Sequence, residues 1–487
     1  MTDLLRWPVI GPLARHQRAR LFLQLPLLGA AVVLVAHGLF GPQIAPRNLA
    51  TVLTWVHYRG LLVIALLAIG NLFCAACPMM LVRDAARRVA HPGWRWPRAL
   101  RRKWPAIVLF AAVLFAYERF DLWSLPRATA WLVLAYFAAA LVVDVLFAGA
   151  SFCKYICPIG QFNFLSATLS PTELRIRNAD TCRSCRTVDC IRGRLAPPPL
   201  TIPLASVRGR AGRAVLQRGC ELNLFLPAKI GNLDCTLCLD CVRACPHDNI
   251  ALATRVPGEE LVETARRSGI GRLSQRPDFA LLCLLFVFGA VINAFAMTAP
   301  AHLVETWIAS ALGTRSETAV LAAVFAAGLV VLPLAMLGAA GVVSGLTGTL
   351  GSETVRTVAL RYAFALVPLG LGIWTAHYGF HLLTGVMTVI PVGQSAAIDL
   401  TGRQILGEPL WMLTGMRPGA VYVIQLGCVL IGMLGSLAVA FQLSARMHPA
   451  RPLLASVPWT LVIVLLAAAA TWVLSQPMEM RAVGLLG

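Results

Sequence analysis

The stretch FALLCLLFVFGAVINAFAMTA, residues 279–299, contains no charged side chain. A helix needs about 20 such residues to cross the hydrocarbon core of a bilayer. The composition is 58% hydrophobic and 13% charged, which is far too apolar for an ordinary soluble protein. Together with residues 279–299, similar runs predict an all-α polytopic membrane protein with about nine transmembrane helices; the other runs are 21–40, 52–73, 104–118, 129–149, 318–343, 356–382, 419–441 and 455–475.

The net charge of +20 lies beside the apolar runs, so it predicts membrane orientation and no nucleic-acid partner. Arginines fill the first 20 residues and the connection from Arg83 to Lys103. The positive-inside rule places both segments in the cytoplasm, and alternation through nine spans places residues 150–278 there too. We therefore expect a multi-pass protein of a bacterial-type inner (plasma) membrane, with its N-terminus in the cytoplasm and lipid around its helices.

Three parts follow along the chain. Residues 1–168 form an N-terminal block of four spans that carries two cysteine pairs, and residues 279–487 form a C-terminal block of five spans. Residues 169–278 are the only long polar stretch, with 17 cations, 11 acids and eight cysteines. So small a domain has little core, and we expect a metal or another cross-link to stabilise it.

Twelve of the fourteen cysteines fall in or beside segments assigned to the cytoplasm, where disulfides are rare. Residues 235–246 read CTLCLDCVRACP, which is the C-x2-C-x2-C-x3-C-P run that binds [4Fe–4S] clusters. Four-cysteine zinc sites usually separate two pairs by a longer loop, so zinc is the alternative that this spacing disfavours.

A second block precedes this run, with Cys182, Cys185 and Cys190 followed by Cys220. In a two-cluster ferredoxin run the fourth cysteine binds the other cluster. That rule assigns one cluster to Cys182, Cys185, Cys190 and Cys245, and the second cluster to Cys235, Cys238, Cys241 and Cys220. The upstream block departs from the standard spacing, so a single cluster with spare thiols stays an alternative. The predicted fold is thus a helical membrane protein with an inserted, cytoplasmic, ferredoxin-like α+β domain.

Two further pairs lie at the predicted inner membrane surface: Cys74 and Cys77, followed by Pro78, and Cys153 and Cys157, followed by Pro158. Helical spacing puts each pair on one face, and proline ends a helix so that thiols there can open toward a metal. These four thiols predict a third iron–sulfur cluster or another metal site. Buried structural cysteine is the alternative, and it applies to Cys283 and Cys428 within spans.

Residues 50–250 resemble the membrane-bound polyferredoxins of the NapH and NosR type, which combine C-x3-C-P motifs on membrane helices with two cytoplasmic [4Fe–4S] clusters. Cys153, Cys157 and Pro158 match the family pattern, whereas Cys74 and Cys77 have a two-residue gap and the C-terminal five-span block has no counterpart. The resemblance implies electron transfer between the quinone pool and a partner reductase or its maturation system.

Two histidines, His377 and His381, lie one helical turn apart near the outer end of the seventh run. With His37, His57 and His302 nearby, they could build a haem b or quinone site; the alternative is interfacial histidines bonded to water or carbonyls. Asp144, at the inner end of the fourth run, is either a proton relay or part of a hydrated helix end.

We expect a membrane-bound iron–sulfur protein that relays electrons between a cytoplasmic partner and the membrane. The basic domain surface suits an acidic carrier such as a ferredoxin or flavodoxin, or a partner oxidoreductase. Two alternatives stay open. One is a quinone oxidoreductase with a quinone site in the membrane block, and the other is an accessory or regulatory protein for the maturation of a partner reductase.

Overall fold

The computed structural model describes residues 2–89, 93–196 and 215–479, and most of them form helices. Eight of the nine predicted spans are confirmed as helices, or stacked helical segments, long and apolar enough to cross a membrane. They are α2 (Ala19–Phe40), α3–α4 (Leu49–Ala68), α8 (Pro126–Leu146), α14 (Pro277–Phe295), α16–α17 (Glu317–Leu346), α18–α19 (Val355–Gly385), α21 (Pro418–Met447) and α22 (Pro452–Ser475).

The remaining predicted span, residues 104–118, forms α7 (Trp104–Arg119). Its 16 residues are fewer than a helix needs to cross a bilayer. It nevertheless runs beside α14. At one end the Lys103 N–H donates to Asp278 at 2.8 Å, and at the other the Asn293 side chain donates to Glu118 at 3.1 Å. Because α7 begins and ends level with a full-length apolar helix, it extends through the same layer of the molecule.

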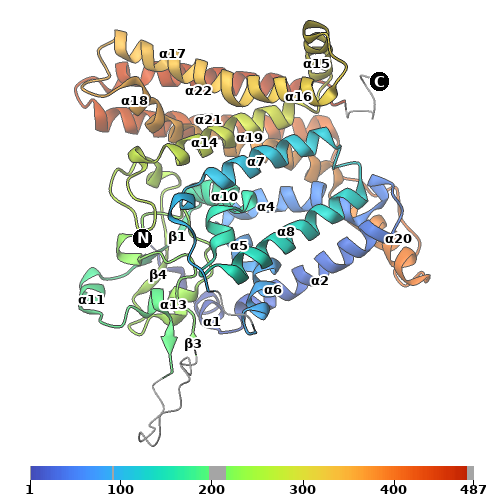
Figure 1. Ribbon diagram of the computed structural model, residues 1–487, viewed down its shortest axis with the longest axis horizontal. Coiled ribbons are helices and arrows are strands. Elements are labelled where there is room, and N and C mark those ends of the chain that lie inside the picture. The colour runs from blue at the N-terminus through green and yellow to red at the C-terminus, as the bar shows by residue number, and fades with distance from the viewer. Residues whose placement is uncertain (1, 90–92, 197–214, 480–487) are drawn as a thin grey trace, which may run out of the picture.

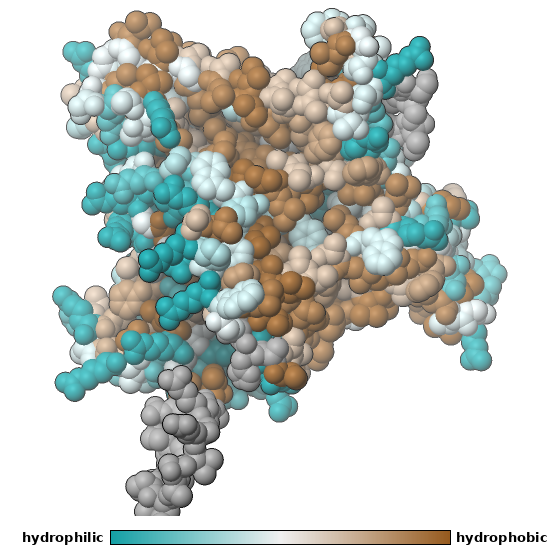
Figure 2. All heavy atoms as spheres, in the orientation of Figure 1, coloured by the Kyte–Doolittle hydropathy of each residue, from teal (hydrophilic) through white to brown (hydrophobic). Residues whose placement is uncertain are grey.

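The surface of the molecule separates into an apolar band and polar ends. Figure 2 shows hydrophobic residues across the middle of the bundle, with hydrophilic residues gathered at its left and right edges. The left edge carries the cysteine domain below and the helix ends near α18 above, and the right edge carries the helix ends near α20 (Val389–Thr401), with α15 (Ala299–Leu312) above them. This distribution is what a bundle lying in a lipid layer requires.

The cysteine domain is built around one short antiparallel sheet. Strand β1 (Thr172–Ile176) pairs with β4 (Ile250–Thr254), so the two ends of the cysteine-rich stretch lie side by side. A smaller pair, β2 (Arg194–Leu195) and β3 (Val215–Gln217), closes a hairpin beyond them. Between the strands lie three short helices, α11 (Ala179–Ser184), α12 (Asp189–Arg192) and α13 (Asp240–Ala244).

The N-terminal segment packs on the cysteine domain, although the sequence placed it in the membrane block. Asp3 forms a β-bridge with Ala253 of β4 and pairs with Arg177 at 2.9 Å, while Arg15 pairs with Asp248 at 3.1 Å. Residues before α2 therefore join the polar domain to the first span.

A buried ion cluster stabilises the loop that leads into the cysteine motif. The Glu260 carboxylate is 1% exposed, pairs with Arg255 and Arg267, and accepts the backbone N–H of Leu233 at 3.1 Å. Burial alone would raise the pKa of Glu260, but the two arginines outweigh it and hold the pKa below its usual value. The ionised carboxylate thus fixes the chain just before Cys235.

Candidate iron–sulfur centres

Two loops of the cysteine domain share one backbone design. Residues 188–192 read Val-Asp-Cys-Ile-Arg and residues 239–243 read Leu-Asp-Cys-Val-Arg. In each loop the first residue is left-handed, with φ of 53° at Val188 and 61° at Leu239, and a short helix follows. Helices α12 and α13 also contact each other. The sequence interpretation missed this internal repeat, which the two pentapeptides would have revealed.

Left-handed residues recur through the loop that carries the second motif. Asp234, Leu237 and Leu239 all have φ between 51° and 62°, which is unfavourable for residues with a Cβ atom. Such turns direct successive backbone N–H groups toward one concave side, where they favour an anion such as a metal-bound thiolate. Strained backbone of this kind is concentrated at binding sites.

Four half-buried thiols form what we call the outer set: Cys182, Cys185, Cys190 and Cys245. Burial, together with the smaller effect of the neighbouring thiols, raises the pKa of Cys190 to about 11. Asn249 connects the set across the chain, since its side chain donates to the Cys182 sulfur at 3.2 Å and its backbone N–H donates to the Cys245 sulfur at 3.4 Å.

The buried set lies deeper in the domain and lines one cavity, together with Leu174, Leu222, Leu224, Leu226, Lys229 and Thr236. Burial raises the pKa of its Cys238 and Cys241 thiols well above the usual value. The Leu224 N–H donates to the Cys220 sulfur at 3.4 Å. Four thiols that line one apolar cavity form a site suited to a soft cation, which binds thiolate ligands. The members of the buried set are Cys220, Cys235, Cys238 and Cys241.

The membrane set lies where helices break beyond the ends of the spans α3–α4 and α8. Cys77 and Cys157 each precede a proline, and each serves as the N-cap of a new helix, α6 (Pro78–Ala86) or α10 (Pro158–Ser166). The Gly160 N–H donates to the Cys157 sulfur at 3.2 Å, and the Asn163 amide donates to the Cys74 sulfur at 3.3 Å. Burial raises the pKa of Cys157 to about 12, with Cys77 close enough to contribute. The members of the membrane set are Cys74, Cys77, Cys153 and Cys157.

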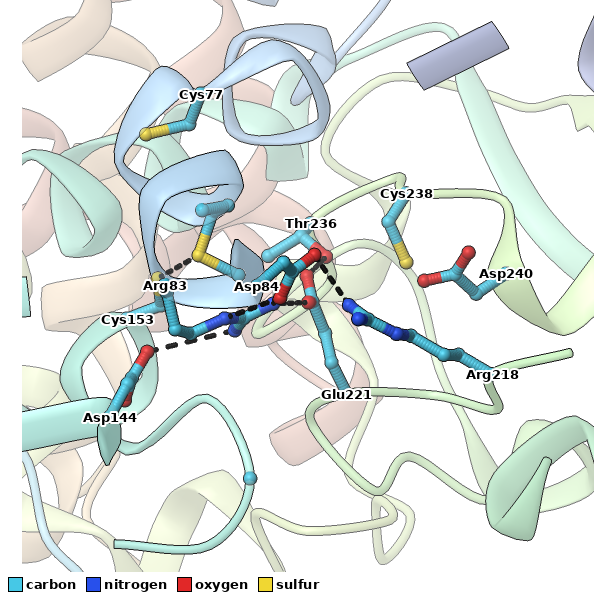
Figure 3. Close-up of polar contacts among 12 residues, drawn as sticks. Cys77, Arg83, Asp84, Asp144, Cys153, Arg218, Glu221, Thr236, Cys238 and Asp240 are labelled. Carbon is cyan, nitrogen blue, oxygen red and sulfur yellow. Dashed lines mark hydrogen bonds and ion pairs between the residues drawn. The ribbon is translucent and has the colours of Figure 1, made fainter. Parts of the chain in front are cut away.

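A network of ion pairs lies between the buried set and the membrane set (Figure 3). Arg83 is 2% exposed and pairs with Glu221 at 3.1 Å and with Asp144 at 3.6 Å. Glu221 also pairs with Arg20 at 3.4 Å and accepts the Thr236 hydroxyl at 3.2 Å. Burial alone would raise the pKa of Glu221, but Arg20 and Arg83 hold it at about 2. In Figure 3, Cys77 and Cys153 lie on one side of this network and Cys238 lies on the other.

Asp144 is therefore a partner in this network. It is 1% exposed, and it accepts the Phe152 N–H at 2.9 Å besides pairing with Arg83. The contacts position the chain one residue before Cys153. Its role as a proton relay stays a prediction.

The histidines separate into two groups. His37 pairs with Asp399 at 3.0 Å, His57 contacts two backbone carbonyls, and His302 lies 3.9 Å from Glu305. His377 and His381 have ring centroids 5.0 Å apart, and within the described ranges neither Nε2 atom has a hydrogen-bond partner.

Within residues 2–89, 93–196 and 215–479, no group of three or more histidine, cysteine, aspartate or glutamate side chains is arranged so that it could hold a metal ion. The ligand assignments thus stay predictions, which are supported by the thiol chemistry of the four cysteines that line one cavity. Comparison with known protein families, with curated proteins and with solved structures finds no match for this chain.

Proposed function

We propose that this chain is a membrane-bound electron-transfer protein that holds one [4Fe–4S] cluster on the outer set and one on the buried set. A third cluster or other metal on the membrane set belongs to the same proposal, as does membership of the polyferredoxin family. The observation that carries most weight is the cavity lined by all four cysteines of the buried set. A bound cluster would accept and release one electron at a time.

The protein's own groups would stabilise a cluster in two ways. Buried thiols with raised pKa values bind as thiolates only when a cation compensates their charge, so metal binding would release protons and stabilise the domain. Backbone and amide N–H groups donate to the sulfurs of Cys220, Cys245 and Cys182, and such bonds favour the more negative, reduced form.

One hydrogen bond joins the outer set to the buried set, and another joins the buried set to the chain beside the membrane set. The Cys220 N–H donates to the Cys190 carbonyl at 2.8 Å, which joins the buried set to the outer set. The Asn71 amide donates to the Cys235 carbonyl at 3.0 Å, and Asn71 lies three residues before Cys74. We infer an electron route from the outer set through the buried set to the membrane set.

The outer set is the natural entry point for a soluble partner. Its cysteines are half-buried, whereas Cys235, Cys238 and Cys241 are no more than 9% exposed. Arg183 and Arg218 are exposed on the same domain, where they pair with Asp180 and Asp84, and residues 169–278 carry 17 cations against 11 acids. An acidic carrier of the ferredoxin or flavodoxin class, or an acidic face of a partner oxidoreductase, complements this surface.

The direct test is to purify the full chain without oxygen and to count its iron and acid-labile sulfide. We expect at least eight iron and eight sulfide per chain, with electron paramagnetic resonance signals of reduced clusters that disappear set by set in cysteine-to-serine variants. Stoichiometric zinc without sulfide would reject the proposal.

A second candidate, a quinone oxidoreductase, is favoured by a polar cluster inside the bilayer region. Arg59 is 8% exposed, donates to the Tyr117 hydroxyl at 3.1 Å and lies 4.6 Å from the ring centroid of Tyr378. No described carboxylate pairs with it. A buried cation without an acid beside two histidines with unpartnered nitrogens would suit the carbonyl oxygens of a quinone.

This candidate predicts that a quinol reduces the clusters of the purified chain. Arg59→Gln would slow that reduction at least tenfold, because it removes a charged donor at the quinone. His302→Gln, a histidine outside the cluster, is the matched control. Reduction by quinol at an unchanged rate in the Arg59 variant would exclude this site.

A further inference from the structure

A second cavity, of about 270 Å³, opens between two helix-connecting loops on the side of the bundle where the cysteine domain lies. One loop joins α17 (Leu332–Leu346) to α18 (Val355–Tyr362), and the other joins α21 to α22. The contact of Arg446 with the Val262 carbonyl at 2.6 Å places the end of α21 against the cysteine domain. None of the fourteen cysteines lies in either loop, so this cavity is separate from the three thiol sets.

The cavity has four polar side chains, of which the two threonines already donate to carbonyls of α17: Thr347 to Val343 and Thr349 to Ser344, each at 3.0 Å. The donors left for a ligand in the described chain are the histidine and the arginine. The cavity is lined by Thr347, Thr349, His448 and Arg451, with Gly348, Met447, Pro449 and Ala450 completing the wall. The His448 Nε2 atom is buried and has no hydrogen-bond partner among the described residues. Arg451 forms no ion pair in the described parts of the chain. A site with this lining favours an anion that can accept several hydrogen bonds.

No acid competes for these donors. Neither loop wall contributes a carboxylate to the cavity, and Glu353, the nearest acid in the α17–α18 loop by sequence, pairs with Arg361 at 2.6 Å. The positive charge of Arg451 is therefore uncompensated where it meets the cavity.

The surroundings of the cavity are apolar on the side of the bundle. Leu346 ends α17 with 83% of its surface exposed, and Leu453 lies in the first turn of α22 with 70% exposed. Both helices are membrane spans by length and composition. Exposed leucines next to a cationic cavity form the boundary at which a lipid places its phosphate above its acyl chains.

We propose that this cavity binds the phosphate of an anionic phospholipid. His448 and Arg451 contact the phosphate oxygens, the threonine hydroxyls lie within the same pocket, and Leu346 and Leu453 face the acyl chains. The sequence predicts the cytoplasmic leaflet for this side, where anionic lipids are concentrated.

The test compares lipids on the full chain in detergent, by native mass spectrometry and by the midpoint of heat denaturation. Phosphatidylglycerol should remain bound and raise the midpoint, whereas phosphatidylcholine should do so weakly. The double variant His448→Gln/Arg451→Gln should lower the apparent affinity for phosphatidylglycerol at least tenfold, because two charge-assisted contacts are removed.

Arg356→Gln is the matched control, since Arg356 is an exposed arginine of α18 that does not line the cavity. It should change the affinity less than twofold. Equal binding of the two lipids, or an equal loss in the control, would overturn the site. Complete displacement of phosphatidylglycerol by millimolar inorganic phosphate, with the same stabilisation, would show that free phosphate is the ligand and would overturn the lipid assignment.

Discussion

The outer and buried thiol sets share a loop design and differ in their surroundings. Each contains a left-handed residue followed by Asp-Cys and a short helix. The outer cysteines are half-buried, whereas those of the buried set line one apolar cavity and three of them are buried. The same loop conformation therefore occurs once near the surface and once in the interior of the domain.

The two sites have the same kind of ligand, so any difference in their function must come from their surroundings. A centre near solvent can meet a partner, while a buried centre loses the stabilisation that water gives to its charge. At the buried site, Glu221 and Asp240 add negative charge and Arg20 and Arg83 balance it. We infer that the surface site exchanges electrons and that the buried site is also structural.

The largest effect should come from removing one ligand in each set. Cys185→Ser and Cys238→Ser should each lose about four iron atoms per chain, because a cubane rarely persists with a missing ligand. Only Cys238→Ser should also lower the heat-denaturation midpoint strongly, because its cavity is in the interior. Iron analysis and thermal unfolding measure both effects.

Cys428→Ser is the control for that pair, since Cys428 lies in span α21 away from the three sets. Its iron content should not change. Equal destabilisation by the Cys185 and Cys238 variants would break the distinction between a surface centre and a structural one.

The second effect concerns the charge network that belongs to the buried site alone. Glu221→Gln leaves Arg20 and Arg83 with less negative charge in a buried place, and we expect a loss of about 3 kcal/mol in the free energy of unfolding. Glu263→Gln makes the same change in an exposed pair with Arg446 and should cost less than about 0.5 kcal/mol. Equal denaturation midpoints of the two variants would mean that the network does not stabilise the interface.

The smallest effect should come from the two left-handed residues. Val188→Gly should raise the free energy of unfolding by about 1 kcal/mol, because glycine tolerates φ of 53° and the valine is not fully buried. Leu239→Gly relieves similar strain but removes a side chain that packs on the core, so we expect no gain. Denaturation midpoints of the metal-loaded protein distinguish the two outcomes, and a gain in both variants would contradict the packing argument.

The sequence by itself determined most of the helices and the grouping of the cysteines into motifs. Apolar runs of about 20 residues have one stable solution in lipid, so eight spans could be located without a structure. The short α7 shows the limit of this reasoning, because its register is set by contacts with α14 at both ends. Close cysteine spacing likewise predicts shared chemistry, since neighbours along the chain must be neighbours in space.

Only the tertiary structure decided what lies between the sites. Arg83 and Glu221 are far apart in the sequence and meet at 3.1 Å, and the N-terminal segment packs against β4 near residue 253. The cavity between the α17–α18 and α21–α22 loops likewise depends on two distant turns. Hydropathy and spacing are local properties of a chain, whereas ion pairs and cavities arise where remote segments pack together, and no local pattern records which segments will meet.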